Sequence, residues 1–208
     1  TFGNNFVKTM IRLGKEKPEL GVVNDQVGCP TYAKDLAWVI FEFIKKLPTI
    51  EYGIYHFSNS GVTSWCGFAQ KIMELYGLNC KVNPITTDQY PTPAKRPKYS
   101  VMNCDKTINT LQINIPHWEN ALEECIQLLK QQEMLEQIDV KKIIAIAEAA
   151  GKEIMQIYDT DDFAVTDKSD NSPLTKADKA GNAVIVAALK EQYPQIPIIS
   201  EENKMIEY

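Results

Sequence analysis

The chain has 208 residues, of which 44% are hydrophobic and 24% are charged, and its formal net charge at pH 7 is −5. This composition is ordinary for a globular protein, and its mild acidity argues against general nucleic-acid binding, which usually needs a basic face. No apolar run reaches the roughly 20 residues that span a bilayer, and Thr1–Asn5 have no signal-peptide character, so we expect a cytoplasmic protein without a membrane anchor.

The first part of the sequence alternates patterns of helices and strands. Apolar residues at helical spacing predict a helix over residues 5–13, and the run Leu20–Val23 predicts a strand. A helix over 32–46 and a strand over 53–57 follow. Ser64 is a suitable N-cap for the next helix, which runs to about Tyr76, and Gly77 suits the position after its C-terminus. We expect a proline-rich loop after Gly77 and a closing helix over 118–129.

The second part predicts fewer strands and longer helices. We expect a long helix over 135–158, a short strand over 163–165, a second helix over 175–192 and a buried strand over 196–199. The sequence between 128 and 135 contains no Gly or Pro, so the two parts are joined either by one continuous helix or by two helices that abut.

A change in composition separates the two parts near residue 132. Residues 1–132 hold 14 Lys and Arg against 12 Asp and Glu, a net charge of +2, whereas residues 133–208 hold 8 against 15, a net of −7. Every Cys, His and Trp lies in the first part. Such asymmetry indicates two units of different origin, 1–132 and 133–208. Because the sequence starts with Thr1 rather than Met, we also expect it to begin inside a longer chain.

The five cysteines do not form a recognisable metal or disulfide pattern. Their number is odd, no two are spaced as C-x-x-C, and only two histidines accompany them. We interpret them as reduced thiols. The sequence also lacks G-x-G-x-x-G, the dinucleotide-binding turn, and has no Tyr followed by Lys four residues later.

Five motifs in the first part, in order and in register, carry a family resemblance. They are Gly3-Asn4-Asn5-Phe6-Val7-Lys8-Thr9-Met10, Asp25-Gln26-Val27-Gly28-Cys29-Pro30-Thr31, Tyr55-His56-Phe57-Ser58-Asn59, Arg96-Pro97-Lys98-Tyr99-Ser100 and Asn114-Ile115-Pro116-His117-Trp118. Together they resemble the C-terminal part of the dTDP-4-dehydrorhamnose reductases, which are extended short-chain dehydrogenases. The resemblance covers about residues 1–131.

The resemblance implies a substrate-binding lobe that works with a separate NAD(P)H-binding Rossmann half. In the family, that half brings the glycine-rich turn and the catalytic Tyr and Lys. The substrate would be a dTDP-4-keto-deoxyhexose. Arg96 can clamp a diphosphate through its planar guanidinium, and Asn4, Asn5 and Gln26 can bind sugar hydroxyls or the base.

Simpler structural roles compete with each of these assignments. Asn and Gln in turn-rich loops often satisfy backbone groups instead, and Arg96 before Pro97 can be a solvated loop charge. We expect His56, in the predicted strand, to be a hydrogen-bonded histidine of the core.

The second part resembles the start of 3′(2′),5′-bisphosphate nucleotidase, within the inositol monophosphatase-like family. The resemblance covers about residues 134–208 and is carried by Asp167-Lys168-Ser169-Asp170-Asn171-Ser172-Pro173-Leu174-Thr175-Lys176-Ala177-Asp178 and by Pro197-Ile198-Ile199-Ser200-Glu201-Glu202. It implies a Mg²⁺-dependent phosphatase acting on adenosine bisphosphate, chemistry that needs hard oxygen ligands.

The family assigns roles to three residues of this part. The residue that matches Glu201 ligates Mg²⁺, the one that matches Asp178 orients the attacking water, and Lys168 matches a basic residue near the site. A structural alternative for Asp178 is the third helical position after a Thr175 cap. The family's second metal cluster, Asp-Pro-x-Asp-Gly-Thr, is not found in the sequence.

The sequence therefore predicts an α/β protein made of two enzyme fragments. We expect the substrate-binding lobe of an extended short-chain dehydrogenase, followed by the truncated N-terminal part of a layered α/β sugar-phosphatase fold, with both active sites incomplete and no catalysis. Three alternatives stay open: a truncated genuine bifunctional fusion, two reading frames joined by error, and a non-catalytic module that binds a sugar nucleotide. A homodimer is compatible with both resemblances.

Overall fold

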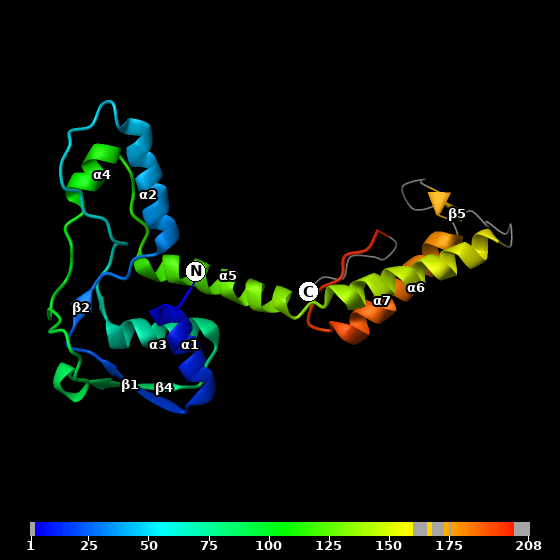
Figure 1. Ribbon diagram of the computed structural model, residues 1–208, viewed down its shortest axis with the longest axis horizontal. Coiled ribbons are helices and arrows are strands. Elements are labelled where there is room, and N and C mark those ends of the chain that lie inside the picture. The colour runs from blue at the N-terminus through cyan, green and yellow to red at the C-terminus, as the bar shows by residue number, and fades with distance from the viewer. Residues whose placement is uncertain (1–2, 160–165, 168–172, 175, 202–208) are drawn as a thin grey trace. The chain divides into compact units, whose positions relative to one another are not determined.

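The protein divides into two compact units, Thr1–Lys130 and Gln131–Tyr208. The computed structural model describes residues 3–159, 166–167, 173–174 and 176–201. The described part is α/β and rich in helix (Figure 1). Helix α5 (Trp118–Glu136) contains the boundary between the units, so a continuous helix joins them, as one of the two sequence predictions has it.

The core of the first unit is built on a pair of parallel strands. Strand β1 (Glu19–Val23) pairs with β4 (Lys81–Ile85), and Glu19 lies opposite Lys81. Helix α3 (Trp65–Tyr76) packs against both strands and against helix α1 (Phe6–Glu16). The buried side chains of these elements and of α5 form one apolar cluster, whose removal from water is the main favourable term in folding this unit.

The ends of α3 follow the capping signals in the sequence. The hydroxyl of Ser64 accepts a hydrogen bond from the backbone N–H of Gly67 at 3.0 Å. Gly77, at the other end, has a φ of 84°, in the left-handed region where Gly avoids the Cβ clash of other residues. Both predicted caps are confirmed.

Shorter elements complete the first unit. Strand β2 (Val27–Gly28) pairs antiparallel with β3 (Thr63–Ser64). Helix α2 (Ala33–Lys46) packs against α4 (Asp105–Leu111), and the short 3₁₀ helix η1 (Thr87–Gln89) follows β4. The helices predicted over 5–13, 32–46 and 118–129 are confirmed, although α1 and α5 extend further.

Three sequence predictions for the first unit are wrong. The strand predicted over 53–57 does not form, and His56 is exposed rather than part of the core. No described segment offers these residues a hydrogen-bonding edge, without which an apolar run stays irregular. Conversely, strand β4 forms in a segment that the sequence predicts to be a loop, a prediction that rested on its Pro84. A proline is tolerated in a strand where its missing N–H faces away from the partner strand.

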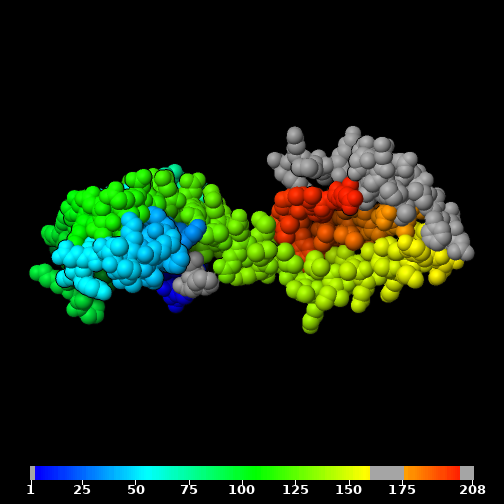
Figure 2. All heavy atoms as spheres, turned by 90° about the horizontal axis from the view of Figure 1, so that it is seen from above, coloured from blue at the N-terminus to red at the C-terminus, as the bar shows by residue number. Residues whose placement is uncertain are grey.

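Helices α6 (Val140–Tyr158) and α7 (Lys176–Gln192) pack side by side and form the body of the second unit (Figure 2). Their contact contains small residues: a Cβ added at Gly181 would lie 2.8 Å from Cδ1 of Ile154. The start of α6 and the end of α7 are joined by Tyr193, whose hydroxyl accepts a hydrogen bond from the backbone N–H of Asp139 at 3.0 Å. Asp139 also caps α6, since its carboxylate accepts from the N–H of Lys141.

The second unit also departs from the sequence predictions. The helix predicted from 135 begins at Val140, because α5 ends at Glu136 and Asp139 starts a new helix as its cap. Residues 196–199 are neither a strand nor buried, and the Ile199 side chain is 83% exposed. The only strands described here, β5 (Thr166–Asp167) and β6 (Pro173–Leu174), pair with each other and not with this run. The strand predicted over 163–165 lies outside the described residues.

Within the described ranges, none of the helices combines the length and apolar character needed to cross a lipid bilayer.

Candidate functional site

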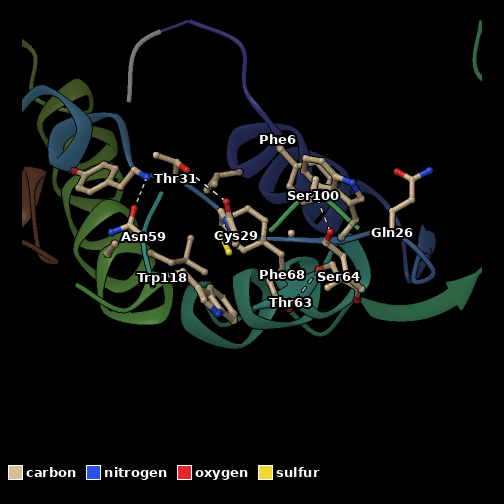
Figure 3. A pocket seen from close by; sticks show the side chains of 18 of the residues that line it. Phe6, Gln26, Cys29, Thr31, Asn59, Thr63, Ser64, Phe68, Ser100 and Trp118 are labelled. Atoms are coloured by element: carbon tan, nitrogen blue, oxygen red, sulfur yellow. Dashed lines mark hydrogen bonds between the residues drawn. The ribbon is translucent and has the colours of Figure 1, made fainter. Parts of the chain in front are cut away.

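The first unit contains a pocket of about 550 Å³ (Figure 3). Its walls come from six places in the chain: the start of α1, the segment from 26 to 33, Asn59, the turn that leads into α3, the start of α5 and the loop from 96 to 100. These segments are far apart in sequence, and the core cluster behind them holds them together. A cavity of this size is in the range of small-molecule sites.

Aromatic side chains line one part of the pocket. The ring of Phe6 lies 4.9 Å from Trp65 and is stacked on Phe68 at 5.6 Å, measured between ring centroids. Phe68 in turn meets Trp118 edge-on at 5.7 Å. Rings in these arrangements attract one another beyond simple burial, so this side of the pocket is a firm apolar surface.

Gln26 lines the pocket at the end opposite Asn59 (Figure 3) and is only 9% exposed. Its Nε2 donates a hydrogen bond to the Thr87 hydroxyl at 3.0 Å. That hydroxyl donates to Asp25 at 2.7 Å, and the bond lowers the pKa of the Asp25 carboxyl below its ordinary value. Gln26 thus lies at the pocket wall with its amide nitrogen already bound to η1.

Asn5 also lines the pocket, and its side chain caps α1. Oδ1 of Asn5 accepts from the backbone N–H of Lys8 at 3.0 Å. This bond satisfies one of the free N–H groups at the start of the helix, which is the structural alternative considered for Asn5. Asn4 is exposed and does not line the pocket.

Arg96 reaches the pocket from a loop that is fastened to β2. The backbone N–H of Val27 donates to the carbonyl of Lys98 at 2.8 Å, and the N–H of Ser100 donates to the carbonyl of Val27 at 2.8 Å. Arg96 lines the pocket from an exposed position. Within the described parts of the chain its guanidinium has no ion pair, so its donors are available to an anion.

Sequence reasoning located three of the pocket residues, Asn5, Gln26 and Arg96, and missed the aromatic ones. The signal for Trp65 was its place directly after the Ser64 cap, which puts it at the first position of α3. Cys29 and Cys125 also line the pocket, although the sequence indicates only ordinary thiols there. None of the five cysteines, all of them in the described part of the chain, is in a disulfide bond, and burial raises the pKa of the Cys66 and Cys80 thiols.

In the second unit, Asp178 and the residue that precedes Glu201 lie at the same face of α7. Asp178 is in the first turn of α7, where the helix dipole favours a carboxylate, and Asn182 follows one turn later on that face. The Ser200 hydroxyl donates to Oδ1 of Asn182 at 2.5 Å and so holds the segment before Glu201 against α7. Both carboxylates are exposed. Lys168 and Thr175 lie outside the described residues.

These carboxylates do not form a complete Mg²⁺ site by themselves. No group of three or more His, Cys, Asp or Glu side chains suited to a metal occurs among the residues that the structure describes. Mg²⁺ is held through several oxygen ligands, and two exposed carboxylates supply only part of such a set.

Comparisons with known proteins match the two units to two different families. Residues 1–131 match the model of the RmlD substrate binding domain family, and residues 133–207 match that of the inositol monophosphatase family. The chain is 45% identical over 125 residues to the spore coat polysaccharide biosynthesis protein SpsK of Bacillus subtilis, covering 60% of this chain and 42% of that protein. It is 38% identical over 136 residues to dTDP-4-dehydrorhamnose reductase of Sinorhizobium fredii, covering 62% and 46% respectively.

Solved structures show the same relationship. A dTDP-4-dehydrorhamnose reductase from Clostridium acetobutylicum superposes with a TM-score of 0.58 at 46% identity, covering 62% of this chain and 45% of that one. The Bacillus anthracis reductase, solved in complex with NADP, gives 0.53 at 45% identity, covering 59% and 42%. This chain thus spans less than half the length of these relatives. It belongs to the RmlD substrate binding domain family through residues 1–131, and its residues 133–207 are similar to the inositol monophosphatase family.

Proposed function

We propose that the first unit binds a dTDP-sugar, the 4-keto-deoxyhexose nucleotide that dTDP-4-dehydrorhamnose reductases reduce. The observation that carries this proposal is the pocket, where Gln26 and Arg96 meet an aromatic wall although they lie 70 residues apart in sequence. A planar guanidinium suits a diphosphate, and aromatic rings suit a nucleobase. The relatives named as reductases support the choice of substrate.

Binding of dTDP to the 208-residue chain tests this proposal. Tryptophan emission can report the binding, because Trp65 and Trp118 line the pocket. We expect Arg96→Ala to raise the Kd for dTDP about 10- to 100-fold, the effect of losing hydrogen bonds to a charged group. Lys95→Ala is the matched control, since Lys95 is the neighbouring cation but does not line the pocket. Equal effects of the two substitutions, or no binding by the unmodified chain, would refute the proposal.

We further propose that a dinucleotide-binding unit completes the reductase by attaching at α2. The exposed face of α2 carries an apolar stripe, in which Ile40 is 51% and Ile44 is 55% exposed. Beside it lies the extended run 53–57, which forms no strand here, and contiguous exposed apolar surface of this kind marks an interaction site. The Bacillus anthracis relative binds NADP and extends well beyond the part matched here, which supports this choice of partner.

Complementation with the unmatched portion of the Bacillus anthracis relative, which was solved in complex with NADP, tests this attachment. Mixed with the 208-residue chain, that portion should restore NADPH oxidation with a dTDP-4-keto-sugar. Ile44→Glu should abolish the restored activity, because a charge on the stripe must be desolvated on docking. Glu42→Gln is the control, since it alters a charge on the same helix that already pairs with Lys45. Restoration by the Ile44→Glu chain would contradict the docking surface.

For the second unit we propose a part of a Mg²⁺-dependent 3′(2′),5′-bisphosphate nucleotidase, with Glu201 as a metal ligand and Asp178 as the residue that orients water. Two observations support this: Ser200, next to Glu201, is bonded to the face of α7 that carries Asp178, and this part of the chain matches the family. In a polypeptide that carries the whole phosphatase domain, Glu201→Gln should nearly abolish phosphate release from adenosine 3′,5′-bisphosphate, because the amide keeps the shape but loses the charge. Glu202→Gln, the adjacent control, should not.

We propose finally that residues 1–208 by themselves catalyse neither reaction. They contain no glycine-rich dinucleotide turn and no Tyr and Lys pair, and the described carboxylates do not make a complete metal set. The general acid–base help that such a pair gives is worth about 10²- to 10⁴-fold in rate.

A further inference from the structure

The pocket wall contains a buried amide that the assignments above do not use. Asn59 lines the pocket, and its side chain is 1% exposed. Its Oδ1 accepts a hydrogen bond from the backbone N–H of Tyr32 at 2.7 Å. Its Nδ2 donates to the carboxylate of Asp35 at 2.5 Å and to the carbonyl of Pro116 at 3.2 Å. One side chain therefore joins three segments that are distant in sequence.

The first two bonds anchor the wall that precedes α2. Tyr32 is the residue before α2, and its own side chain makes no capping hydrogen bond to that helix. Its N–H is instead satisfied by Asn59, while Asp35 in the first turn of α2 accepts from the same side chain. The segment from Cys29 to Ala33, which lines the pocket, thus ends at a fixed point (Figure 3).

The third bond anchors the opposite wall. The carbonyl of Pro116 accepts from Asn59 and also from the backbone N–H of Ser60, at 3.0 Å. Ser60 in turn accepts from the N–H of Trp118 at 2.9 Å, and Trp118 is part of the aromatic surface of the pocket. The turn at 59–60 thus fixes where α5 begins.

The chemistry at this point requires an amide. The position needs one acceptor for an N–H and two donors for oxygen atoms, and a primary amide supplies all three in one plane. A carboxylate has the same shape but no donors, and it would face the charge of Asp35 directly. A buried network of this kind is strong when complete and costly when one partner is lost.

We infer that Asn59 is a positioning residue that sets the spacing between the Tyr32 wall and the Trp118 wall. It acts on the bound nucleotide through these walls, and in this respect the inference rests on the proposed function. Its action on the pocket itself does not depend on which ligand binds. The substitution Asn59→Asp should loosen the wall that contains Cys29.

Two measurements on the 208-residue chain test this inference. The first is the rate at which a maleimide alkylates Cys29, located by peptide mass spectrometry, and it needs no ligand. We expect Asn59→Asp to raise this rate about tenfold or more, because an unsatisfied buried group favours local opening by at least that factor. The second is the Kd for dTDP, which should rise by a similar factor.

Two further variants separate positioning from a general loss of structure. Asn83→Asp makes the same chemical change at a pair outside the pocket, where Nδ2 of Asn83 donates to Glu19 at 2.9 Å, and it should alter neither measurement. The exchange Asn59→Asp with Asp35→Asn restores an amide–carboxylate pair with its partners reversed. It should recover most of the Cys29 protection, which depends on the Tyr32 wall, but only part of the dTDP affinity, because the carboxylate introduced by Asn59→Asp has no donor for the carbonyl of Pro116.

The outcomes distinguish this inference from the proposed function. An unchanged Cys29 rate in Asn59→Asp, or a double variant no better than the single one, would overturn the role of Asn59. If Asn59→Asp does not fold, the double variant decides: Cys29 protection near that of the unmodified chain supports the inference, and its absence overturns it. If the unmodified chain does not bind dTDP, the proposed function fails, and the Cys29 rates still decide whether Asn59 positions the pocket.

Discussion

Gly61 offers a sharp test of how the pocket is held together. Its φ is +87°, and a Cβ built at this position would lie 2.1 Å from Nε2 of His117 and 2.7 Å from Cδ1 of Trp118. The substitution Gly61→Ala therefore adds two penalties. The left-handed backbone costs about 1–2 kcal/mol for a residue with a Cβ, and displacing packed rings costs about 1–3 kcal/mol more.

Gly77 supplies the matched control. Its φ is +84°, nearly the same, but a Cβ at this position would meet nothing within 4 Å. Gly77→Ala should therefore cost only the backbone penalty of about 1–2 kcal/mol. The difference between the two variants isolates the clash with His117 and Trp118.

Urea unfolding, followed by tryptophan emission, measures this difference in the stability of the first unit. All three Trp residues lie in the first 130 residues, so their emission does not report unfolding of the second unit. With a slope of about 2 kcal/mol per molar urea, the midpoint of Gly61→Ala should lie about 0.5–1.5 M below that of Gly77→Ala. It should also bind dTDP more weakly, because Trp118 must move. Coincident midpoints would refute the packing that we describe around Gly61.

Three further outcomes are expected. The 208-residue chain should show no substrate-dependent oxidation of NADPH with a dTDP-4-keto-sugar, and clear turnover in that absorbance assay would contradict the need for a dinucleotide-binding unit. In the second unit, Gly181→Leu should destabilise the contact of α7 with Ile154 by about 1–3 kcal/mol. Gly151→Ala should instead stabilise α6 by about 0.5–1 kcal/mol, because a Cβ at this position meets nothing within 4 Å. Hydrogen exchange of α6 and α7 measures both effects. Because the Thr87 hydroxyl lowers the pKa of Asp25, the stability from this bond should be complete above the ordinary Asp pKa and lost as pH falls through the lowered value. Asp25→Asn should remove that part of the acid dependence of the unfolding midpoint, and an unchanged dependence would rule out the Asp25–Thr87 bond as its source.

Part of the site could be predicted from sequence because its signals are local. Asn5 and Gln26 stand in motifs for which the family resemblance implies binding residues, and both line the pocket. Their partners were beyond prediction, however: Gln26 is bound to Thr87, which lies 61 residues further along the chain. Arg96 stands in a loop motif, and its place at the pocket depends on the pairing of that loop with Val27.

Strands were predicted less well than helices because a strand depends on its partner. The apolar runs at 53–57 and 196–199 have strand character, yet neither has an edge to pair with among the described residues. The run at 81–85 contains Pro84 and looks like loop, yet it pairs with β1 along its whole length. Whether such a run becomes a strand is decided by hydrogen bonds to a distant segment, which local sequence does not encode.

The sequence by itself determined most of the helices, the two caps of α3 and the two family resemblances, and it predicted two units of different composition. These follow from charge, from apolar spacing and from side chains that bond within four residues, such as Ser64 to Gly67. Only the tertiary structure decided that the aromatic wall, Arg96 and the buried Asn59 surround one pocket. The physical reason is that the burial of apolar surface in the core draws these segments together, and the long-range hydrogen bonds of Asn59 then select one arrangement of the walls.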